Sequence, residues 1–409
     1  MPDWQVGRLG GVLRAIEAGK SPDLPDTPAP AGMWGVLKVS AIGNGVFRPD
    51  ENKSVTRPAL IHPEHEVRDG DILLSRCNTS DLVGLACHVR QPRPGLLLCD
   101  KTLRLVVDGS RAVPRFIAWA LASSAVRRQI SVHATGTSGS MKNIQQEAIR
   151  NLVLPLPAIA EQHRIAEILD AIDQAIKGTE AVITKLRYVY AGILWDRISA
   201  FALRQKEGGD GGQISVRQAG SVQLGRQRSS DASHENGGQP YLRVANVYDG
   251  FIDTSDVLRM QFSPHEREIF SILPGDILLN EGQSLELVGR CAIYRGRPNV
   301  FSFQNSLVRF RCNESVSPEF MRAVFKLWLD AGRFMQIAKQ TTSMAHLGAE
   351  RFARMSFVRP PLPEQERVAA ILGAAEDRIA AEEMVCSKLR LQKQGLMHDL
   401  LTGRVRVKA

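Results

Sequence analysis

The chain has 409 residues, enough for two or three domains, and its 44% hydrophobic and 23% charged residues exclude an intrinsically disordered chain. Its six cysteines form no CxxC pair, no apolar run reaches the roughly 18 residues of a membrane span, and Met-Pro-Asp-Trp does not begin a signal peptide, so we expect a cytoplasmic protein with reduced thiols. The net charge of +9 favours a polyanionic partner, most often a nucleic acid.

The first predicted element is a globular module over residues 1–157. Its apolar runs are short, rich in β-branched residues and separated by Gly, Pro, Asn and Asp, a pattern typical of strands. Towards its end, the segment 114–130 begins with proline and has apolar residues three or four positions apart, which predicts a helix. We expect a mixed, β-rich domain.

A long helix is predicted over residues 158–205, because residues 161–196 contain no proline and carry a heptad-like apolar series. The residues expected to pack along this seam are Ile165, Ile168, Ile172, Val182, Leu186, Val189 and Ile193. A Gly-rich link at 208–212 leads into a second β-rich module over 206–362, with a helix predicted at 318–338. A second long helix is predicted over 363–409, with Gly403 at its end. Its expected seam residues are Val368, Ile371, Val385, Leu389 and Leu396.

The chain is an internal repeat. Residues 161–196 align without a gap with residues 364–399, beginning with Glu-Gln-His-Arg-Ile-Ala-Glu-Ile-Leu and Glu-Gln-Glu-Arg-Val-Ala-Ala-Ile-Leu, and Pro-Leu-Pro precedes both. Upstream, Asp-Gly-Asp-Ile-Leu-Leu at 69–74 matches Pro-Gly-Asp-Ile-Leu-Leu at 274–279, and both are followed by Leu-Val-Gly. The repeating unit is therefore a module of about 155 residues followed by a long helix.

Connectivity predicts how the two helices pair. The second module follows the first helix through a short link and directly precedes the second helix, so the end of one helix and the start of the other must be close. The helices are then antiparallel, with one module at each end of the pair. At 1.5 Å per residue, about 40 residues make a rod of roughly 60 Å.

Over essentially the whole chain, the sequence resembles the specificity subunit of type I restriction–modification systems. The resemblance rests on motifs that occur twice: Pro-Leu-Pro followed by Glu-Gln-x-Arg-(Ile/Val)-Ala-x-Ile-Leu, the later Lys-Leu-Arg, and Gly-Asp-Ile-Leu-Leu in each module. The resemblance implies an α+β fold in which two β-rich target-recognition domains, 1–157 and 206–362, are held apart by two long antiparallel coiled-coil helices. A pseudo-two-fold internal repeat relates the two halves.

The resemblance also implies a function in phage defence without catalysis in this chain. Each target-recognition domain would read one half of a bipartite asymmetric DNA site, and the helix pair would set the spacing. The implied partners are double-stranded DNA, two methyltransferase subunits that use S-adenosylmethionine, and restriction subunits that use ATP and Mg²⁺.

Candidate DNA contacts are polar residues that occupy equivalent places in both modules, because Arg, Lys, Asn, Gln, Ser and Thr read base edges and phosphates. One group follows the Ile-Leu-Leu strands: Arg76, Asn78, Thr79, Asn280, Gln283 and Ser284. A second precedes the last strands: Thr135, Thr137, Ser138, Lys142, Lys339, Thr341, Thr342 and Ser343. A third lies at strand ends: Lys38, Ser40, Arg243 and Asn246.

Two other functions fit the same sequence. The helices can serve as an interaction scaffold without sequence-specific DNA binding, or a module can carry metal-dependent nuclease activity. Asp71 and Asp276, at equivalent positions, are the natural catalytic candidates for a nuclease, although Asp beside Gly is typical of a turn. No catalytic motif is recognisable: Gly19-Lys20-Ser21 has Arg14 where a phosphate-binding loop needs glycine, and Pro63 separates His62 from His65.

Overall fold

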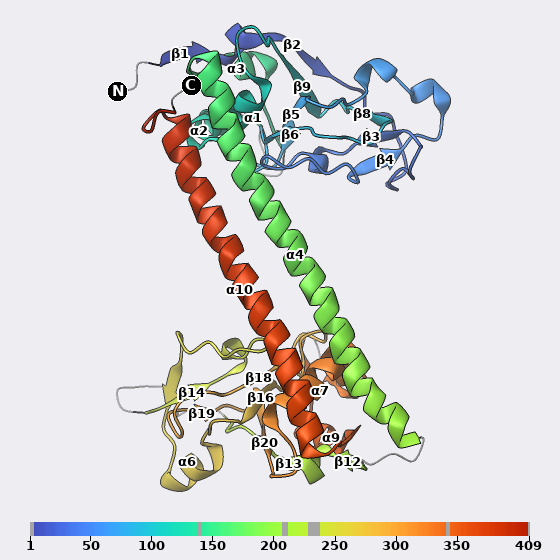
Figure 1. The fold of residues 1–409 in the computed structure, drawn as a ribbon, viewed down its shortest axis with the longest axis vertical. Helices are drawn as coiled ribbons and strands as arrows, with labels where there is room; N and C mark the ends of the chain where they lie inside the picture. Colours follow the sequence, from blue (N-terminus) through green and yellow to red (C-terminus); the bar gives the residue numbers. More distant parts are fainter. Residues whose placement is uncertain (1–3, 137–140, 207–211, 228–237, 341–343, 408–409) are drawn as a thin grey trace. The chain divides into compact units, whose positions relative to one another are not determined.

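The computed structural model describes residues 4–136, 141–206, 212–227, 238–340 and 344–407, with the side chains of 202–206 excepted. The chain divides into two compact units. The first unit consists of residues Met1–Glu180 and Met384–Ala409, and the second of residues Ala181–Glu383. Each unit combines one β-rich module with part of two long helices (Figure 1), which confirms the α+β class expected from the sequence.

The first unit contains short strands and helices in the order expected from the sequence. Its strands are β1 (Gln5–Arg8), β2 (Leu13–Ala18), β3 (Gly35–Leu37), β4 (Asn52–Ser54), β5 (Ile72–Ser75), β6 (Cys77–Asn78), β7 (Ala86–His88), β8 (Leu96–Leu97), β9 (Thr102–Val107), β10 (Lys142–Asn143) and β11 (Val153–Leu156). Its short helices are η1 (Leu9–Val12), η2 (Val39–Ala41), η3 (Pro58–Leu60), η4 (Pro63–His65), α1 (Pro114–Ala122), α2 (Ser124–His133) and α3 (Gln146–Arg150).

The second unit repeats this order. Its strands are β12 (Gln213–Ser215), β13 (Gly220–Leu224), β14 (Gln239–Leu242), β15 (Leu258–Met260), β16 (Ile277–Asn280), β17 (Gly282–Gln283), β18 (Cys291–Ile293), β19 (Ser302–Phe303), β20 (Leu307–Cys312), β21 (Lys339–Gln340), β22 (Ala345–His346) and β23 (Ser356–Val358). Its short helices are α5 (Val216–Ala219), η6 (Val244–Asn246), α6 (Pro264–Phe270), α7 (Pro318–Asp330), α8 (Arg333–Ile337) and α9 (Ala349–Arg354).

The sheets of the two units have the same connectivity. A four-stranded sheet has the order β2-β9-β5-β7 in the first unit and β13-β20-β16-β18 in the second. A three-stranded sheet has the order β4-β3-β8 in the first and β15-β14-β19 in the second, with one parallel pair in each. The first strand of each module pairs with its last, β1 with β11 and β12 with β23. The repeat seen in the sequence is therefore a repeat of topology.

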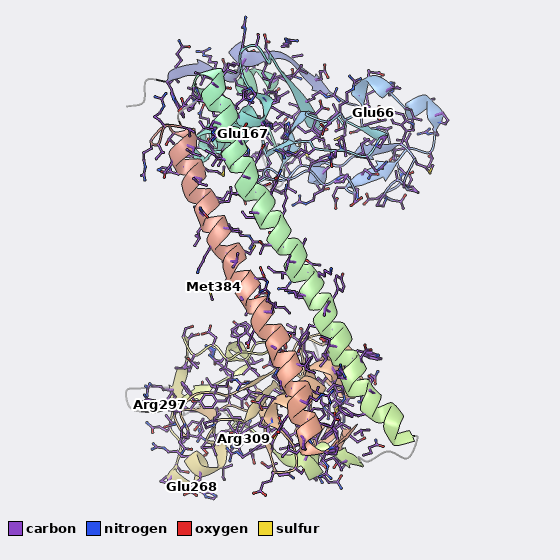
Figure 2. The ribbon with its side chains drawn as sticks, viewed as in Figure 1. Glu66, Glu167, Glu268, Arg297, Arg309 and Met384 are labelled. Carbon is purple, nitrogen blue, oxygen red and sulfur yellow. The ribbon has the colours of Figure 1, made fainter. Side chains whose placement is uncertain are left out.

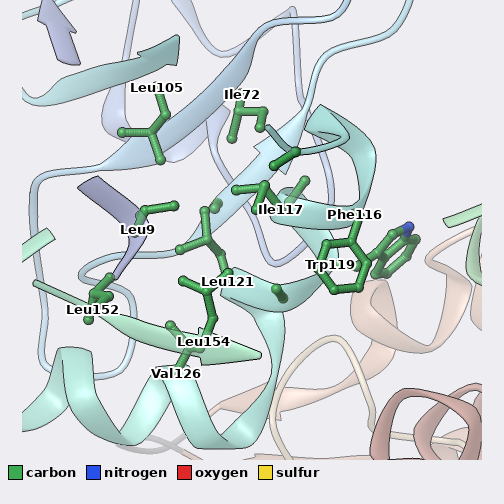
Figure 3. Close-up of a cluster of buried hydrophobic side chains, with 14 of the residues drawn as sticks. Leu9, Ile72, Leu105, Phe116, Ile117, Trp119, Leu121, Val126, Leu152 and Leu154 are labelled. Carbon is green, nitrogen blue, oxygen red and sulfur yellow. The ribbon is translucent and has the colours of Figure 1, made fainter. Parts of the chain in front are cut away.

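The Gly-Asp-Ile-Leu-Leu motif forms a central strand that is buried on both faces. In β5, Ile72 and Leu74 point into one core with α1 and α2 (Figure 3), while Leu73 points into a second core against the three-stranded sheet. In β16, Ile277 and Leu279 lie in one core and Leu278 in the other. Because side chains alternate along a strand, a continuous apolar run is the pattern that such a strand needs.

The helix predicted near the end of each module is divided in two. In the first unit α1 and α2 meet at Ser123, whose side chain accepts a hydrogen bond from the backbone N–H of Val126 and caps α2. In the second unit α7 and α8 are separated at Gly332, which has a φ of 67°. The predicted segments are correct, but a cap and a left-handed glycine turn the chain within each.

Two long helices, α4 (Ile159–Lys206) and α10 (Leu362–Leu401), follow the two modules. The prediction extended the second helix to residue 409, but α10 ends at Leu401, just before Gly403. In the first unit Asp173 pairs with Lys393 at 2.5 Å and Glu180 with Arg390 at 2.7 Å, so residue numbers rise along one helix while they fall along the other. In the second unit Arg187 pairs with Glu383, and the hydroxyl of Tyr190 donates to Glu376, both at 2.6 Å. The two helices are antiparallel within each unit.

The predicted seam is right in one row of residues and shifted by one residue in the other. The first predicted row is buried or half-buried: Ile165, Ile172, Leu186, Ile193, Val368, Leu389 and Leu396. In the second predicted row, Ile168 and Ile371 are half-buried. The prediction is wrong for Val182, Val189 and Val385, which are 43%, 49% and 46% exposed. The buried second row is instead Leu169, Ile176, Ile183 and Tyr190 in α4, and Leu372 and Cys386 in α10. In α4, Ile176, Ile183 and Tyr190 are larger than Ala175, Val182 and Val189 and bury more apolar area.

The glutamine of the repeated Glu-Gln motif attaches each helix to its module. Gln162 is 1% exposed; its Oε1 accepts from the N–H of Val113 at 2.8 Å and its Nε2 donates to the carbonyl of Pro157 at 2.8 Å. Gln365 is fully buried and makes the same two bonds, with Ser317 and Pro360, at 2.9 Å each. A buried amide with both ends paired fixes the angle at which the helix leaves the module.

Glu161 holds the two ends of the first unit together in a cluster that we call the terminal clasp: Trp4, Glu161, Arg406 and Val407. The carboxylate accepts two hydrogen bonds from the Arg406 guanidinium at 2.9 Å, one from the Val407 N–H at 3.1 Å and one from the Trp4 indole at 3.2 Å. The hydrogen bonds from Arg406 hold the pKa of Glu161 below its usual value of 4.5.

The terminal clasp is expected to open in acid. Because the pKa of Glu161 is lower in the folded than in the unfolded chain, its stabilisation is present above pH 4.5 and is lost as the pH falls through the folded pKa. Trp4 fluorescence should therefore change on acidification from pH 5 before global unfolding. Glu161→Gln should show the acid spectrum already at neutral pH; an unchanged Trp4 signal in this variant would contradict the assignment.

Among the described residues, no helix combines the length and the apolar character that a membrane crossing requires.

Candidate nucleic-acid interface

Two of the three predicted groups of DNA-contacting residues lie together in each unit. In the first, β6 pairs with β10, with Asn78 opposite Lys142 and Cys77 opposite Asn143. In the second, β17 pairs with β22, which also pairs with β21, so Lys339 lies opposite His346. We call β6–β10 the first side sheet and β17–β22–β21 the second side sheet. Segments more than 60 residues apart in sequence thus form one surface in each unit.

The residue that follows the central strand is held in the same way in both units. The N–H of Arg76 donates to the carbonyl of Lys101 at 2.8 Å, and its carbonyl accepts from the N–H of Ile144 at 3.0 Å. The N–H of Glu281 donates to Ser306 at 2.8 Å, and its carbonyl accepts from Leu347 at 2.9 Å. The backbone therefore presents Arg76 and Glu281 from equivalent positions, with opposite charges.

The first side sheet brings five of the predicted residues together. Arg76, Asn78 and Lys142 are half-buried, and Thr79 and Thr135 are exposed. Lys142 donates to the carbonyl of Gly136 at 2.7 Å, and Thr135 forms a bridge with Asn143. The predicted residues Thr137 and Ser138 lie outside the described part of the chain.

The second side sheet carries fewer predicted residues. Gln283 and Ser284 are half-buried, with Gln283 Oε1 accepting from the Ser284 N–H at 3.0 Å, and Lys339 is exposed. Thr341, Thr342 and Ser343 lie outside the described residues.

In the third predicted group, at the strand ends, Lys38, Ser40 and Arg243 each form an ion pair or a hydrogen bond with a carboxylate. Lys38 pairs with Asp26 at 2.7 Å, the hydroxyl of Ser40 donates to Glu51 at 2.6 Å, and Arg243 pairs with Asp256 at 2.8 Å. The hydrogen bond to Asp26 raises the pKa of the Lys38 ammonium. These pairs are at the surface, where an ion pair is weak, so a phosphate can compete for the cations.

The predicted base contacts of Asn246 and Asn280 are wrong, because both side chains serve the fold. Asn246 is 2% exposed; it accepts from the N–H of Arg243 and donates to the carbonyls of Asp253 and Asp256 at 3.0 and 2.8 Å. Asn280 is fully buried, and its amide donates to the carbonyl of Val247. Each side-chain amide forms hydrogen bonds with backbone groups of nearby turns. The sequence alone does not distinguish an Asn that stabilises a turn from an Asn that contacts a base.

The sequence reasoning missed a Glu–His pair in the second side sheet. His346 Nδ1 lies 2.9 Å from Glu281 Oε2, and the other carboxylate oxygen accepts from the N–H of Gly348 at 3.3 Å. His346 aligns with Asn143 in the repeat, and this difference between the two halves was the available signal. In the same unit, the guanidinium carbon of Arg290 lies 5.0 Å from the ring centroid of Tyr248, and this ring stacks on Phe251.

Asp71 and Asp276 are turn residues held by arginines. Asp71 accepts from the N–H of Arg68 at 2.8 Å and from Arg104 Nε at 2.9 Å. Asp276, only 1% exposed, accepts from the N–H of Leu273 and from Arg311, each at 2.7 Å. Both carboxylates thus stabilise the turn before the central strand. Within the described ranges, no three His, Cys, Asp or Glu side chains converge as metal ligands.

Residues 111–187 match the family model of the type I restriction modification DNA specificity domain. The EcoEI specificity subunit of Escherichia coli is 30% identical over 168 residues, or 41% of this chain; the aligned part is 28% of that subunit, so the match spans less than a third of its length. The EcoKI specificity subunit of Escherichia coli K12 is 23% identical over 352 residues, 81% of this chain and 73% of that subunit.

A solved structure has the same fold along nearly the whole chain. The S subunit of a type I restriction–modification system from M. genitalium superposes with a TM-score of 0.63 at 14% identity, covering 98% of this chain and 96% of that one. The resemblance predicted from the sequence is therefore confirmed: the chain is similar in sequence to type I restriction enzyme specificity subunits, has the fold of an S subunit, and over residues 111–187 matches the family model of the type I restriction modification DNA specificity domain.

Proposed function

We propose that this chain is the DNA specificity subunit of a type I restriction–modification complex and that it has no catalytic activity of its own. The modules 1–157 and 206–362 are its target-recognition domains, and each reads one half of a bipartite asymmetric site. One observation carries the proposal. The two units share one topology and present their side sheets from equivalent positions, yet the side chains there differ, as two different half-sites require.

Double-stranded DNA is the proposed ligand. The net charge of +9 favours it, and the side sheets present Arg76, Lys142 and Lys339 together with exposed threonines. The long helices set the distance between the two half-sites.

We further propose that two methyltransferase subunits, which use S-adenosylmethionine, dock on the long helices, that restriction subunits using ATP and Mg²⁺ complete the complex, and that the complex acts in the cytoplasm. Support for docking comes from apolar residues on the helices that the chain leaves uncovered. Tyr188 and Trp195 of α4 are 76% and 57% exposed. In α10, Leu391 is 69% exposed and Met384, which is labelled in Figure 2, is 59% exposed. Tyr188 aligns with Leu391 in the repeat, so each helix offers an equivalent site.

The function is tested by DNA footprinting of the chain together with its methyltransferase partner. We expect two protected stretches separated by an unprotected spacer of constant length. The affinity should fall steeply with salt, because binding releases counterions from the DNA and this release is less favourable at high salt. One contiguous protected patch, or equal binding to all sequences at low salt, would contradict the two-reader model. A tight complex with the methyltransferase but no DNA binding would identify the chain as a protein scaffold instead.

A further inference from the structure

We infer that two aligned pairs of residues, Arg76 with Asn143 and Glu281 with His346, determine which base each unit reads at one position of its half-site. Arg76 selects guanine, and His346, oriented by Glu281, selects a base that presents an exocyclic amino group, adenine or cytosine. The inference rests on the proposed DNA-reading function and goes beyond it by assigning specificity to four side chains.

Backbone hydrogen bonds fix the positions from which both pairs of side chains project. Arg76 and Glu281 each follow the buried central strand, and hydrogen bonds hold them on both sides at 2.8 to 3.0 Å. Asn143 and His346 each sit in the partner strand of the side sheet, opposite Cys77 and Gly282. A residue held by a rigid scaffold reads a base at lower entropic cost than a residue on a free loop, so these positions suit specificity.

In the second unit the pair is already assembled. An ionised carboxylate only accepts hydrogen bonds, so Glu281 takes the Nδ1–H of His346. A neutral imidazole that donates from Nδ1 has an acceptor at Nε2. Glu281 is largely buried, with 13% of its side chain exposed, while the His346 side chain is 42% exposed. The imidazole is therefore the group that can reach a ligand, and an acceptor there matches the N6 amino group of adenine or the N4 amino group of cytosine.

The small residue opposite His346 supports this orientation. A Cβ built at Gly282 would lie 3.3 Å from Met344 Sδ and 3.6 Å from His346 Cε1. The glycine thus leaves the space that the imidazole and the thioether occupy beside each other. Met344 is 48% exposed, and its aligned residue Met141 is 59% exposed, so each site has an exposed apolar neighbour suited to contact with a base or sugar.

In the first unit the equivalent pair is incomplete. Arg76 Nε and Asn143 Oδ1 are shielded from solvent and have no hydrogen-bond partner in the part of the chain that the structure describes. A buried donor and a buried acceptor that stay unpaired each cost free energy, and a ligand that pairs them recovers it. A G·C pair fits, because O6 and N7 of guanine accept the fork of an arginine and the N4 amino group of the paired cytosine is a donor for Asn143 Oδ1.

The inference is tested by selecting bound sequences from a duplex library with both half-sites randomised, using the chain in complex with its methyltransferase partner. In Arg76→Lys, which keeps the charge but loses the fork, the preference for guanine at one position of one half-site should fall roughly tenfold or more. In His346→Asn, the preference should change at one position of the other half-site only. Glu281→Gln should change the same position as His346→Asn.

Matched controls separate charge and folding from base reading. Arg128→Lys and Glu268→Gln (Glu268 is labelled in Figure 2) make the same substitutions at exposed positions on α2 and α6 and should leave both preferences unchanged. Asn143→Ala provides a second variant for the first unit if Arg76→Lys does not fold, as judged by its melting temperature.

The outcomes distinguish this inference from the proposed function. If the wild-type complex selects a bipartite sequence and Arg76→Lys and His346→Asn keep all base preferences, the residue assignment is overturned and the function stands. The assignment also fails if both variants alter the same half-site. If the wild-type complex selects no sequence at all, the proposed function itself is overturned.

Discussion

Replacing Gly289 by alanine is expected to lower the free energy of unfolding of the second unit by about 2–5 kcal/mol, the sum of backbone strain and overpacking. Gly289 has a φ of 85°, in the left-handed region. A Cβ there would lie 2.2 Å from Cδ2 of Phe334, a fully buried ring in the core of this unit. The third position of the repeated Leu-Val-Gly motif therefore requires glycine in both units. At Gly84 of the first unit, a Cβ would lie 2.5 Å from Cγ2 of Ile130.

Chemical denaturation with hydrogen-exchange detection in residues 277–312 measures this loss. Gly192→Ala is the matched control. Gly192 lies in the part of α4 that belongs to the second unit, and a Cβ there has no heavy atom within 4 Å, so alanine should stabilise the helix by about 0.5–1 kcal/mol. A loss below 1 kcal/mol in Gly289→Ala would show that Phe334 can move aside and that the packing argument is wrong.

Replacing Tyr188 and Leu391 by serine is expected to remove the two methyltransferase subunits one at a time. On the proposed function, each side chain is buried by one docked subunit. Burying a large apolar side chain is worth about 1.5–3 kcal/mol, so each change should weaken one docking site about tenfold or more. Native mass spectrometry of the complex should shift from two methyltransferase copies to one in either single variant and to none in the double variant at the same concentrations.

Conservative changes provide the control for docking. Tyr188→Leu and Leu391→Met keep the apolar area and should retain both copies. Since the two residues are 76% and 69% exposed in the chain alone, the serine variants should melt at the wild-type temperature. Two bound copies in the double serine variant would place the docking surface elsewhere.

The architecture could be predicted from the sequence because the same pattern of strands and helices occurs in both halves of the chain. The helix bounds, the antiparallel pairing and the central strand follow from heptad spacing, connectivity and a continuous apolar run, each of which is a local pattern. The seam was shifted by one residue in one row because Ile168 and Leu169, or Val182 and Ile183, are both apolar, and only packing decides between neighbours. Side-chain volume favours Ile183 over Val182, but it does not separate Leu169 from Ile168.

The candidate interface was less predictable because polarity does not reveal what a polar side chain bonds. Asn246 and Asn280 fit the pattern of base-reading residues but serve the turns around the central strand. The Glu281–His346 pair joins residues from segments that are distant in sequence, and it becomes visible only when β17 and β22 pair. Asn78 and Lys142, by contrast, come from two separately predicted groups and lie opposite each other in one sheet.

The two units differ in how the chain supplies them. The second unit is continuous, from Ala181 to Glu383, whereas the first needs Met384–Ala409 to complete it, and Leu400 and Leu401 enter its core. During synthesis on the ribosome, the second unit can therefore finish folding first. The first unit, although its larger part is made earlier, keeps the apolar face of its helix open until residues 384–409 emerge, so it is exposed to chaperones and proteases for longer than the second unit.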